Sequence, residues 1–241
     1  AVFFMLMSAT NFGLHFLSFS KRSFKYYLAN DELKLFLSII FVVVLVSTLT
    51  LHIKEGFSVS DSVRYGFFQS ISIVTTTGYT LEPLSGLGGS VGFLIFILAF
   101  IGACSGSVGG GMKVWRVLLM LKVGFSNITK IIHPSAVSSV KLNGEKIVSS
   151  QIEAVFSFIA IYVSFFLLFM FILIFQNVDF YSAFSGTAAA INNLGPGLGN
   201  FSENYSALSD VGKFTLTMAM IVGRLELFGV LILFVPSFWR S

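Results

Sequence analysis

The chain has 241 residues, of which 55% are hydrophobic and only 11% are charged, with a mean hydropathy of +0.89. Soluble domains typically carry about 25% charged residues to keep their surface hydrated, so this composition excludes an ordinary soluble domain and indicates a membrane protein. The formal net charge of +4 predicts no nucleic-acid partner, because positive charge in membrane proteins collects in cytoplasmic loops. The single cysteine, Cys104, excludes a disulfide within the chain.

Three apolar stretches reach the length of about 20 residues that a membrane-spanning helix needs. The chain opens in an apolar run without signal-peptide features, so we expect a fragment that begins partway through a helix. A fourth stretch, residues 91–103, is too short to cross; it enters the glycine-rich segment CSGSVGGG and then resumes, which predicts an interrupted helix. The predicted spans are residues 35–51, 152–175 and 214–235, the last anchored at an interface by Trp239 and Arg240.

Two further apolar segments, residues 60–74 and 179–191, are too short and too polar to span the membrane. Each begins near an aspartate suited to a helix N-terminus, Asp61 or Asp179, and each ends in a polar stretch that contains glycine. Half-length helices of this kind are typical of re-entrant segments, which enter the membrane and return to the same side.

The order of spanning helix, re-entrant helix, polar loop and spanning helix occurs twice, over residues 34–124 and 147–238. A shift of 117 positions places Phe67 on Phe184 and Gly78 on Gly195. Internal repeats are a common build of transport proteins. The sequence therefore predicts an all-α transmembrane fold made of helix–pore-helix–helix repeats.

Lysine and arginine orient the chain, because they are enriched in cytoplasmic loops. The loops around the re-entrant segments carry more acidic than basic residues, so we expect them to face outside, where a negative bias attracts cations. The basic residues assigned to the cytoplasmic side are Lys21, Arg22, Lys25, Lys34, Lys113, Arg116, Lys122, Lys130, Lys141, Lys146 and Arg240.

The segment TTTGY, directly after the first re-entrant helix, resembles the TVGYG filter of potassium channels. Such filters use backbone carbonyls to replace the hydration shell of the ion, and a central glycine allows the positive φ that turns successive carbonyls to one axis. An ordinary turn is the alternative, but the position after a half-length membrane helix favours the filter. The predicted ion-binding residues are Thr75, Thr76, Thr77, Gly78 and Tyr79.

The segment NNLGPGLGN holds the same place in the second repeat. Gly-Pro-Gly is an ordinary turn in soluble proteins, but two asparagine side chains in a membrane need a polar cavity or hydrogen-bond partners. We therefore predict a second, unlike filter strand, and a pore of unlike strands should be less selective than one of identical strands. Its predicted residues are Asn192, Asn193, Leu194, Gly195 and Pro196.

The glycine-rich interruption predicts a mobile loop that gates a pore beneath the filter, since irregular backbone at membrane depth is tolerated beside protein or water. A helix kink that permits close packing is the alternative. The segment fits neither a phosphate-binding GxxxxGK[ST] loop nor a GxSxG nucleophile elbow. The predicted gate residues are Gly106, Ser107, Gly109, Gly110, Gly111 and Arg224.

Arg224 lies inside the third predicted span, where a charge costs about 2.5–3.5 kcal/mol and marks a functional site by default. It would either form an electrostatic barrier to cations or hold the glycine-rich loop through its carbonyls. Glu226 is not expected to pair with it, since residues i and i+2 of a helix do not face each other. The histidines His15, His52 and His133 are scattered and have no carboxylate or cysteine at metal-ligand spacing.

Together these segments resemble the TrkH/TrkG type of potassium-uptake transporter, within the Trk/Ktr/HKT superfamily. The resemblance covers nearly the whole chain and would make it the C-terminal half of such a protein. The segments that carry it are TNFGLHF at residues 10–16, SIVTTTGYT at 72–80, GACSGSVGGGMKVWR at 102–116, AAAINNLGPGLGN at 188–200 and GRLELFGVLILFVPSFWR at 223–240.

The resemblance implies four repeats around one potassium-channel-like pore in the bacterial inner membrane, of which this chain holds two and the end of another. Without the N-terminal half of the protein it could not close a pore. A homodimer is implied, regulated by a cytosolic nucleotide-binding subunit of the TrkA type that docks on the basic face. The implied division is residues 1–30, the end of the second repeat and a cytoplasmic linker; 31–124, the third repeat with filter strand and gating loop; 125–146, a cytoplasmic linker; and 147–241, the fourth repeat with filter strand.

The expected function is potassium uptake, with K+ bound at filter carbonyls and no covalently bound cofactor. A less selective Na+/K+ transporter is the first alternative, since one glycine per strand leaves fewer carbonyl sites than TVGYG. A membrane enzyme is the second, but the sequence has no nucleophile–base pair, metal cluster or cofactor motif, so we expect no enzyme. A pore requires that Gly78 and Gly195 lie close together on a shared axis.

Overall fold

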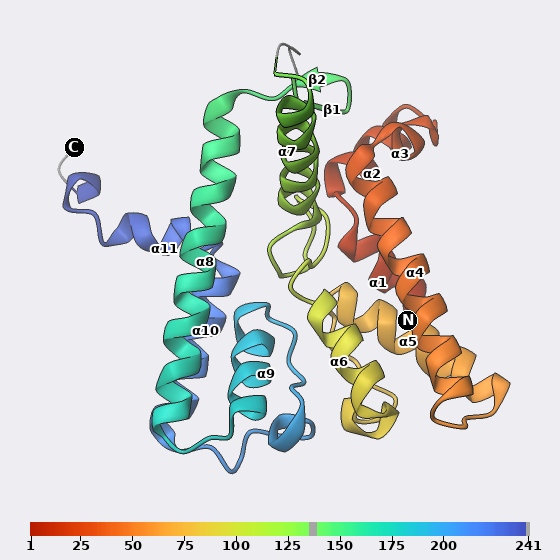
Figure 1. Cartoon of the computed structure of the whole chain (residues 1–241), viewed down its shortest axis with the longest axis vertical. Helices are drawn as coiled ribbons and strands as arrows, with labels where there is room; N and C mark the ends of the chain where they lie inside the picture. Colours follow the sequence, from red (N-terminus) through yellow and green to blue (C-terminus); the bar gives the residue numbers. More distant parts are fainter. Residues whose placement is uncertain (135–138, 240–241) are drawn as a thin grey trace.

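The structure, a computed structural model, describes residues 1–134 and 139–239. The predicted anchor Arg240 and residues 135–138 of the predicted linker lie outside the described residues. Within the described part the chain is helical, apart from loops and one antiparallel hairpin of β1 (Lys141–Leu142) and β2 (Glu145–Lys146) (Figure 1). The predicted all-α class is confirmed.

Two helices, α4 (Asp31–Ile53) and α8 (Ser149–Phe175), have the length and apolarity of membrane spans. At a rise of about 1.5 Å per residue, α4 with 23 residues and α8 with 27 exceed the hydrocarbon thickness of about 30 Å. Large apolar side chains on their outer faces, such as Phe41 and Phe171, are exposed, as expected for a surface that meets lipid. The first two predicted spans are therefore confirmed.

The chain begins with two short helices, α1 (Val2–Ala9) and α2 (Phe12–Ser20), followed by α3 (Lys25–Ala29). The first two meet at an angle of 97°, so they form a further crossing only if the bent pair is counted as one span. Asn11 begins α2 by accepting the N–H of Gly13 at 2.7 Å.

The predicted re-entrant segments are the half-length helices α5 (Val59–Val74) and α9 (Phe180–Ile191). Ser58 caps α5 by accepting the N–H of Asp61, and Asp179 caps α9 by accepting the N–H of Ser182. Each packs against the long helix before it, α5 on α4 and α9 on α8 (Figure 1). At about 1.5 Å per residue, neither is long enough to cross a bilayer.

The predicted interrupted helix is α6 (Gly89–Leu98), an irregular segment, and α7 (Val114–Ile132). We call residues 99–113 the central loop. The 3₁₀ turn η1 (Leu84–Leu87) precedes α6, and η2 (Gly199–Phe201) lies between α9 and α10 (Asp210–Arg224). In Figure 1 the β hairpin lies at one end of the molecule and the turns into α5 and α9 at the other, which agrees with the predicted orientation.

The third predicted span, residues 214–235, is wrong as one continuous helix. Instead, α10 ends at Arg224, the backbone turns with positive φ at Glu226 (52°) and Leu227 (44°), and α11 (Phe228–Leu233) and η3 (Pro236–Trp239) follow in another direction (Figure 1). The physical reason lies in the two charges at the break. The guanidinium of Arg224 donates to a carbonyl of the central loop, and the carboxylate of Glu226 pairs with Arg116. A straight helix would point these two side chains in different directions and could not make both contacts.

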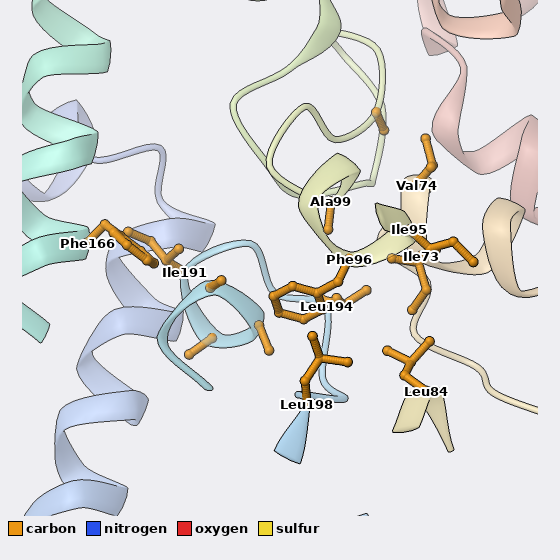
Figure 2. Packing of buried hydrophobic residues seen from close by; sticks show 14 of the residues in the cluster. Ile73, Val74, Leu84, Ile95, Phe96, Ala99, Phe166, Ile191, Leu194 and Leu198 are labelled. Atoms are coloured by element: carbon orange, nitrogen blue, oxygen red, sulfur yellow. The ribbon is translucent and has the colours of Figure 1, made fainter. Parts of the chain in front are cut away.

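A continuous apolar core joins the two half-length helices to α6 (Figure 2). Ile73 of α5, Phe96 of α6 and Ile191 of α9 are buried, and Leu194 and Leu198 beyond α9 are buried in the same cluster. Because these side chains come from both halves of the chain, their packing fixes the segments after α5 and α9 relative to each other.

Candidate functional site

The segments that follow α5 and α9 have positive φ at equivalent positions. In the TTTGY segment (residues 75–79), φ is positive at Thr76 (54°) and Gly78 (81°); in the NNLGP segment (residues 192–196), it is positive at Asn193 (52°) and Gly195 (104°). These pairs are related by the same shift of 117 residues that the sequence shows. A positive φ at every second residue turns carbonyls that would otherwise alternate in direction toward one side.

Hydrogen bonds repeat with the same shift. The N–H of Thr77 donates to Ser72 O at 2.9 Å, and the N–H of Leu194 donates to Ala189 O at 2.8 Å. The preceding residues, Thr76 and Asn193, each donate their N–H to the carbonyl three residues earlier, at 3.0 Å in both cases. Two different sequences therefore end their helices with the same pattern of hydrogen bonds.

The two segments touch at Gly78. A Cβ built on this residue would lie 2.0 Å from the carbonyl oxygen of Leu194 and 3.2 Å from Cδ of Pro196. Positive φ and the lack of space both require glycine here. A Cβ on Gly195 would meet no atom of the described residues within 4 Å. The two segments are therefore in direct contact at Gly78, through Leu194 and Pro196, while the shared axis of Gly78 and Gly195 stays a prediction.

The polar side chains of both segments have protein partners. Asn192 is fully buried; its Oδ1 accepts the hydroxyl of Tyr162 at 2.7 Å and its Nδ2 donates to Ala188 O at 2.9 Å. Asn193 Nδ2 donates to Met220 O at 3.3 Å, and the hydroxyls of Thr75 and Thr77 lie 2.8 Å apart. These side-chain hydrogen bonds support the backbone of the two segments.

Two tyrosines lie in or beside the segments, one exposed and one in contact. Tyr79 is 67% exposed, so its ring does not pack behind the TTTGY segment in the described structure. Tyr205, which sequence reasoning missed, donates its hydroxyl to Gly195 O at 2.9 Å and so occupies one lone pair of a predicted ion ligand. Burial raises the pKa of Tyr205, so this hydroxyl keeps its proton.

The central loop lies directly against the bases of both segments. A Cβ on Gly109 would lie 3.0 Å from Thr75 O, and one on Gly110 would lie 2.0 Å from Asn192 O. The hydroxyl of Thr76 accepts the N–H of Gly110 at 2.6 Å. The adjacent glycines of the loop are therefore needed for close backbone contact, which the predicted gate position beneath the filter would require.

Two cations hold the central loop, the exposed Arg224 and the buried Lys113. Arg224 Nη1 donates to Val108 O at 3.0 Å, so of the two roles considered for it the structure shows the contact with loop carbonyls. Lys113, assigned to the cytoplasmic side from sequence, is only 6% exposed; its Nζ donates to Ser107 O at 3.4 Å and also to Gly109 O. Its backbone φ of 73° turns the side chain into the loop.

A cavity of about 250 Å³ lies between the central loop and α10. Glu226 and Arg116 form an ion pair of 3.0 Å beside it. Among the described residues no group of His, Cys, Asp and Glu is arranged to hold a metal ion. The residues that line the cavity are Ser107, Val108, Gly109, Gly110, Gly111, Lys113, Gly223, Arg224 and Glu226.

The predicted gate residues meet in one place. Gly106 O accepts the N–H of Phe12, which ties the loop to α2, and Ser107 Oγ donates to Cys104 O at 2.5 Å. A Cβ on Gly111 would lie 2.6 Å from Cα of Gly102, so the loop closes tightly on itself. Membrane-length helices, paired segments after half-length helices, and a loop held by fixed charges define an integral membrane transport protein.

Comparison with known proteins specifies the family. The family model TrkH, described as a cation transport protein, matches residues 1–241, and the chain belongs to the TrkH family of cation transport proteins. This confirms the resemblance seen in the sequence. Since the family consists of transport proteins, the expectation that the chain is not an enzyme is also confirmed.

Relatives match along the whole chain. The Trk system potassium uptake protein TrkH of Escherichia coli (strain K12) is 39% identical over 239 residues, which are 99% of this chain and 50% of that protein. The Trk system potassium uptake protein TrkG of the same strain is 32% identical over 238 residues, 99% of this chain and 49% of that protein. The chain spans about half the length of the curated relatives it matches.

The fold also matches a solved structure. The crystal structure of the potassium transporter TrkH from Vibrio parahaemolyticus superposes with a TM-score of 0.93 at 38% sequence identity. The match covers 99% of this chain and 52% of that chain.

Proposed function

We propose that this chain is the C-terminal half of the pore-forming subunit of a potassium uptake system in a bacterial inner membrane. K+ passes between the TTTGY and NNLGP segments, and the central loop gates the pathway beneath them. The observation that carries the proposal is the contact of Gly78 with the Leu194 carbonyl, which joins two backbone segments of equal conformation. The potassium-uptake names of the relatives support the choice of ion.

The proposed division of the chain follows the repeats. Residues 31–124 form the third repeat, residues 125–146 a cytoplasmic linker and residues 147–241 the fourth repeat, with residues 1–30 ending the second repeat. Two further repeats, from an N-terminal half of the same protein, complete the ring of filter strands. The equal hydrogen bonds after α5 and α9 support an origin of both halves from one repeated unit.

The proposed filter works through backbone carbonyls. A K+ ion that sheds its water needs several oxygen ligands at once, and carbonyls held toward one side replace that shell. The supporting bonds of Asn192 and the threonine pair keep the backbone from relaxing when an ion leaves. K+ is cargo in this scheme, and no covalent cofactor takes part.

The proposed gate works through sterics and charge. The central loop fills the space under both segments, and Lys113 and Arg224 place positive charge beside the cavity there. A fixed positive charge repels a cation, and the repulsion is strong where water is excluded. Opening requires the loop and its two cations to move aside together.

A partner is proposed for the cytoplasmic face. Lys130, Lys141 and Lys146 are exposed around the end of α7 and the β hairpin, which suits a cytosolic nucleotide-binding subunit of the TrkA type. Two copies of the complete subunit form the proposed homodimer.

A less selective Na+/K+ transporter is a second candidate, favoured by one observation. The hydroxyl of Tyr205 donates to Gly195 O, so one lone pair of this carbonyl oxygen is no longer free to bind an ion. The two candidates differ in the ratio of potassium to sodium uptake.

The test is cation uptake into proteoliposomes by the full-length protein, comparing potassium, rubidium and sodium. We expect potassium and rubidium uptake to exceed sodium uptake. Gly78→Ser should erode this preference by about tenfold, the change produced by roughly 1.4 kcal/mol, because its Cβ would displace the Leu194 carbonyl.

Gly86→Ser is the matched control, because a Cβ there meets nothing within 4 Å and φ is not positive. Equal uptake of sodium and potassium by the parent would favour the less selective transporter. No uptake of any ion, with the partner subunit and nucleotide supplied, would contradict the proposed function.

A further inference from the structure

One carboxylate joins the middle of the central loop to the start of the helix that follows it. Glu32, in the first turn of α4, is only 4% exposed. Its Oε1 accepts the N–H of Ser105, in the middle of the central loop, at 2.5 Å, and the N–H of Trp115, just beyond the loop in the first turn of α7, at 3.1 Å. These two contacts span the part of the loop that lies under the TTTGY and NNLGP segments.

The helix that follows the loop depends on this contact for its cap. α7 begins at Val114, and its N-cap residue Lys113 makes no capping hydrogen bond, because an ammonium group has no acceptor for a backbone N–H. An acceptor is normally supplied at this position by a neighbouring serine, threonine, aspartate or asparagine. Here it comes from Glu32, on another helix.

The hydrogen bonds of Glu32 resist rearrangement because its carboxylate is buried. A buried carboxylate is tolerated only where it is paired or hydrogen-bonded, and among the described residues Glu32 forms no ion pair. Its bonds to Ser105 and Trp115, together with the nearby charge of Lys113, therefore offset part of the cost of its burial. Charge-assisted hydrogen bonds are roughly twice as strong as neutral ones, so moving the central loop away from Glu32 is unfavourable.

The residue before Glu32 joins the same helix end to the β hairpin. Asp31 Oδ2 accepts Lys122 Nζ at 2.8 Å and the N–H of Asn143 at 3.2 Å, and the N–H of Asp31 donates to Asn143 Oδ1 at 2.8 Å. Asn143 is in the hairpin turn, with a φ of 50°. Direct contacts therefore run from the hairpin through Asp31 and Glu32 to the central loop at Ser105 and to the start of α7 at Trp115.

We propose that Glu32 is a positioning residue of the gate. Through Ser105 and Trp115 it holds the central loop in its closed position, and Asp31 makes that hold depend on the position of the β hairpin. The inference rests on the proposed function, in which the loop closes the pathway and a partner acts on the cytoplasmic face. A displacement of the hairpin moves the start of α4 and with it the loop.

The test substitutes Glu32→Gln in the full-length protein. Glutamine keeps the size and one acceptor oxygen but removes the charge, so two charge-assisted bonds become neutral. We expect basal rubidium uptake into proteoliposomes, without partner subunit, to rise roughly threefold or more. The ratio of potassium to sodium uptake should stay unchanged, because the TTTGY and NNLGP segments are intact.

A second readout follows the loop itself. Cys104 is the single cysteine of this chain and is buried beside Ser105. Its reaction with N-ethylmaleimide, measured by the mass of its peptide, should become faster in Glu32→Gln by a similar factor. Glu153→Gln is the matched control, since Glu153 is exposed in the first turns of α8, and both readouts should match the parent.

Asp31→Asn provides a second variant that leaves the buried contact in place, and we expect smaller increases in the same direction. If Glu32→Gln does not fold, Asp31→Asn is the variant that tests the proposal. Unchanged uptake and unchanged Cys104 reaction in the folded variants would overturn the proposal. A faster Cys104 reaction in a protein that takes up no ion would support the positioning role and contradict the proposed function.

Discussion

At the scale of single residues, the site depends on two non-glycine residues with positive φ, Thr76 and Asn193. This conformation is uncommon for any L-residue, and for a β-branched threonine it is a real outlier. It costs on the order of 1–3 kcal/mol and persists only where surrounding contacts hold it. Here the contacts are the backbone bond of Thr76 to Ile73 and its hydroxyl bond to Gly110.

Sequence could predict the glycines of this arrangement but not its threonine. Gly78 and Gly195 stand out because glycine is the usual residue at positive φ. Thr76 carries no such signal, and its role depends on a loop residue 34 positions away. The donor to Asn192 was also missed, because a tyrosine within an apolar helix looks like any packing residue until its partner is known.

The Tyr162 hydroxyl gives the first prediction at this scale. Tyr162→Phe leaves the buried Oδ1 of Asn192 without its donor, which costs about 1–3 kcal/mol. We expect the melting midpoint of the purified protein to fall by several degrees and the potassium preference to weaken, since Asn192 begins the NNLGP segment. Tyr26→Phe, at an exposed ring, is the control. An unchanged melting midpoint would show that the bond contributes nothing.

At the scale of elements, hydropathy and length predicted the long helices and the half-length helices. Both properties are local, so α4, α5, α8 and α9 follow from their own residues. The break after α10 could not be found this way, since residues 214–235 are apolar enough to continue. It depends on the contact of Arg224 with Val108 and of Glu226 with Arg116, both more than 100 residues away.

The start of α9 provides a pH-dependent prediction. The backbone N–H of Ser182, bonded to the Asp179 carboxylate, lowers the pKa of Asp179 below its usual value of 3.8. The folded state therefore favours the carboxylate: its contribution is complete above the usual value and is lost as the pH falls through the lowered pKa. Asparagine caps helices about as well as aspartate but does not titrate.

Melting of the parent and of Asp179→Asn between pH 6 and pH 3 tests this step. We expect similar midpoints at pH 6, and a smaller loss for Asp179→Asn as the pH approaches 3. Asp210→Asn, at the fully exposed start of α10, should follow the parent. Parallel curves for all three proteins would mean that the Asp179 bond does not stabilise the fold.

At the scale of the whole molecule, the central loop connects parts that the sequence presents separately. Its glycines contact both the TTTGY and NNLGP segments, Arg224 reaches it from α10, and Glu32 holds it from α4. The glycine-rich composition predicted a loop in this place. Which charges would hold it could not be predicted, because Glu32 looks like an ordinary acidic residue at the start of a helix.

This arrangement places Thr76 in both the proposed filter and the contact with the proposed gate. Thr76→Val keeps the β-branched shape, so the backbone strain at positive φ is unchanged, but it removes the acceptor of the Gly110 N–H. The half-buried Gly110 N–H would then lose its partner, at a cost of up to about 1–3 kcal/mol. This loss loosens the central loop and the TTTGY backbone together. We therefore expect basal rubidium uptake to rise about tenfold and the potassium-to-sodium ratio to fall in the same variant.

Proteoliposome uptake of the full-length Thr76→Val protein measures both quantities, and Thr80→Val, at an exposed position four residues on, is the control. A Glu32→Gln protein should change only the basal rate, and Gly78→Ser mainly the ratio. If Thr76→Val changed only the basal uptake or only the potassium-to-sodium ratio, the proposed gate and the proposed filter would act independently. If both changed, the bond between the Thr76 hydroxyl and the Gly110 N–H would let the closed central loop stabilise the conformation of the proposed filter.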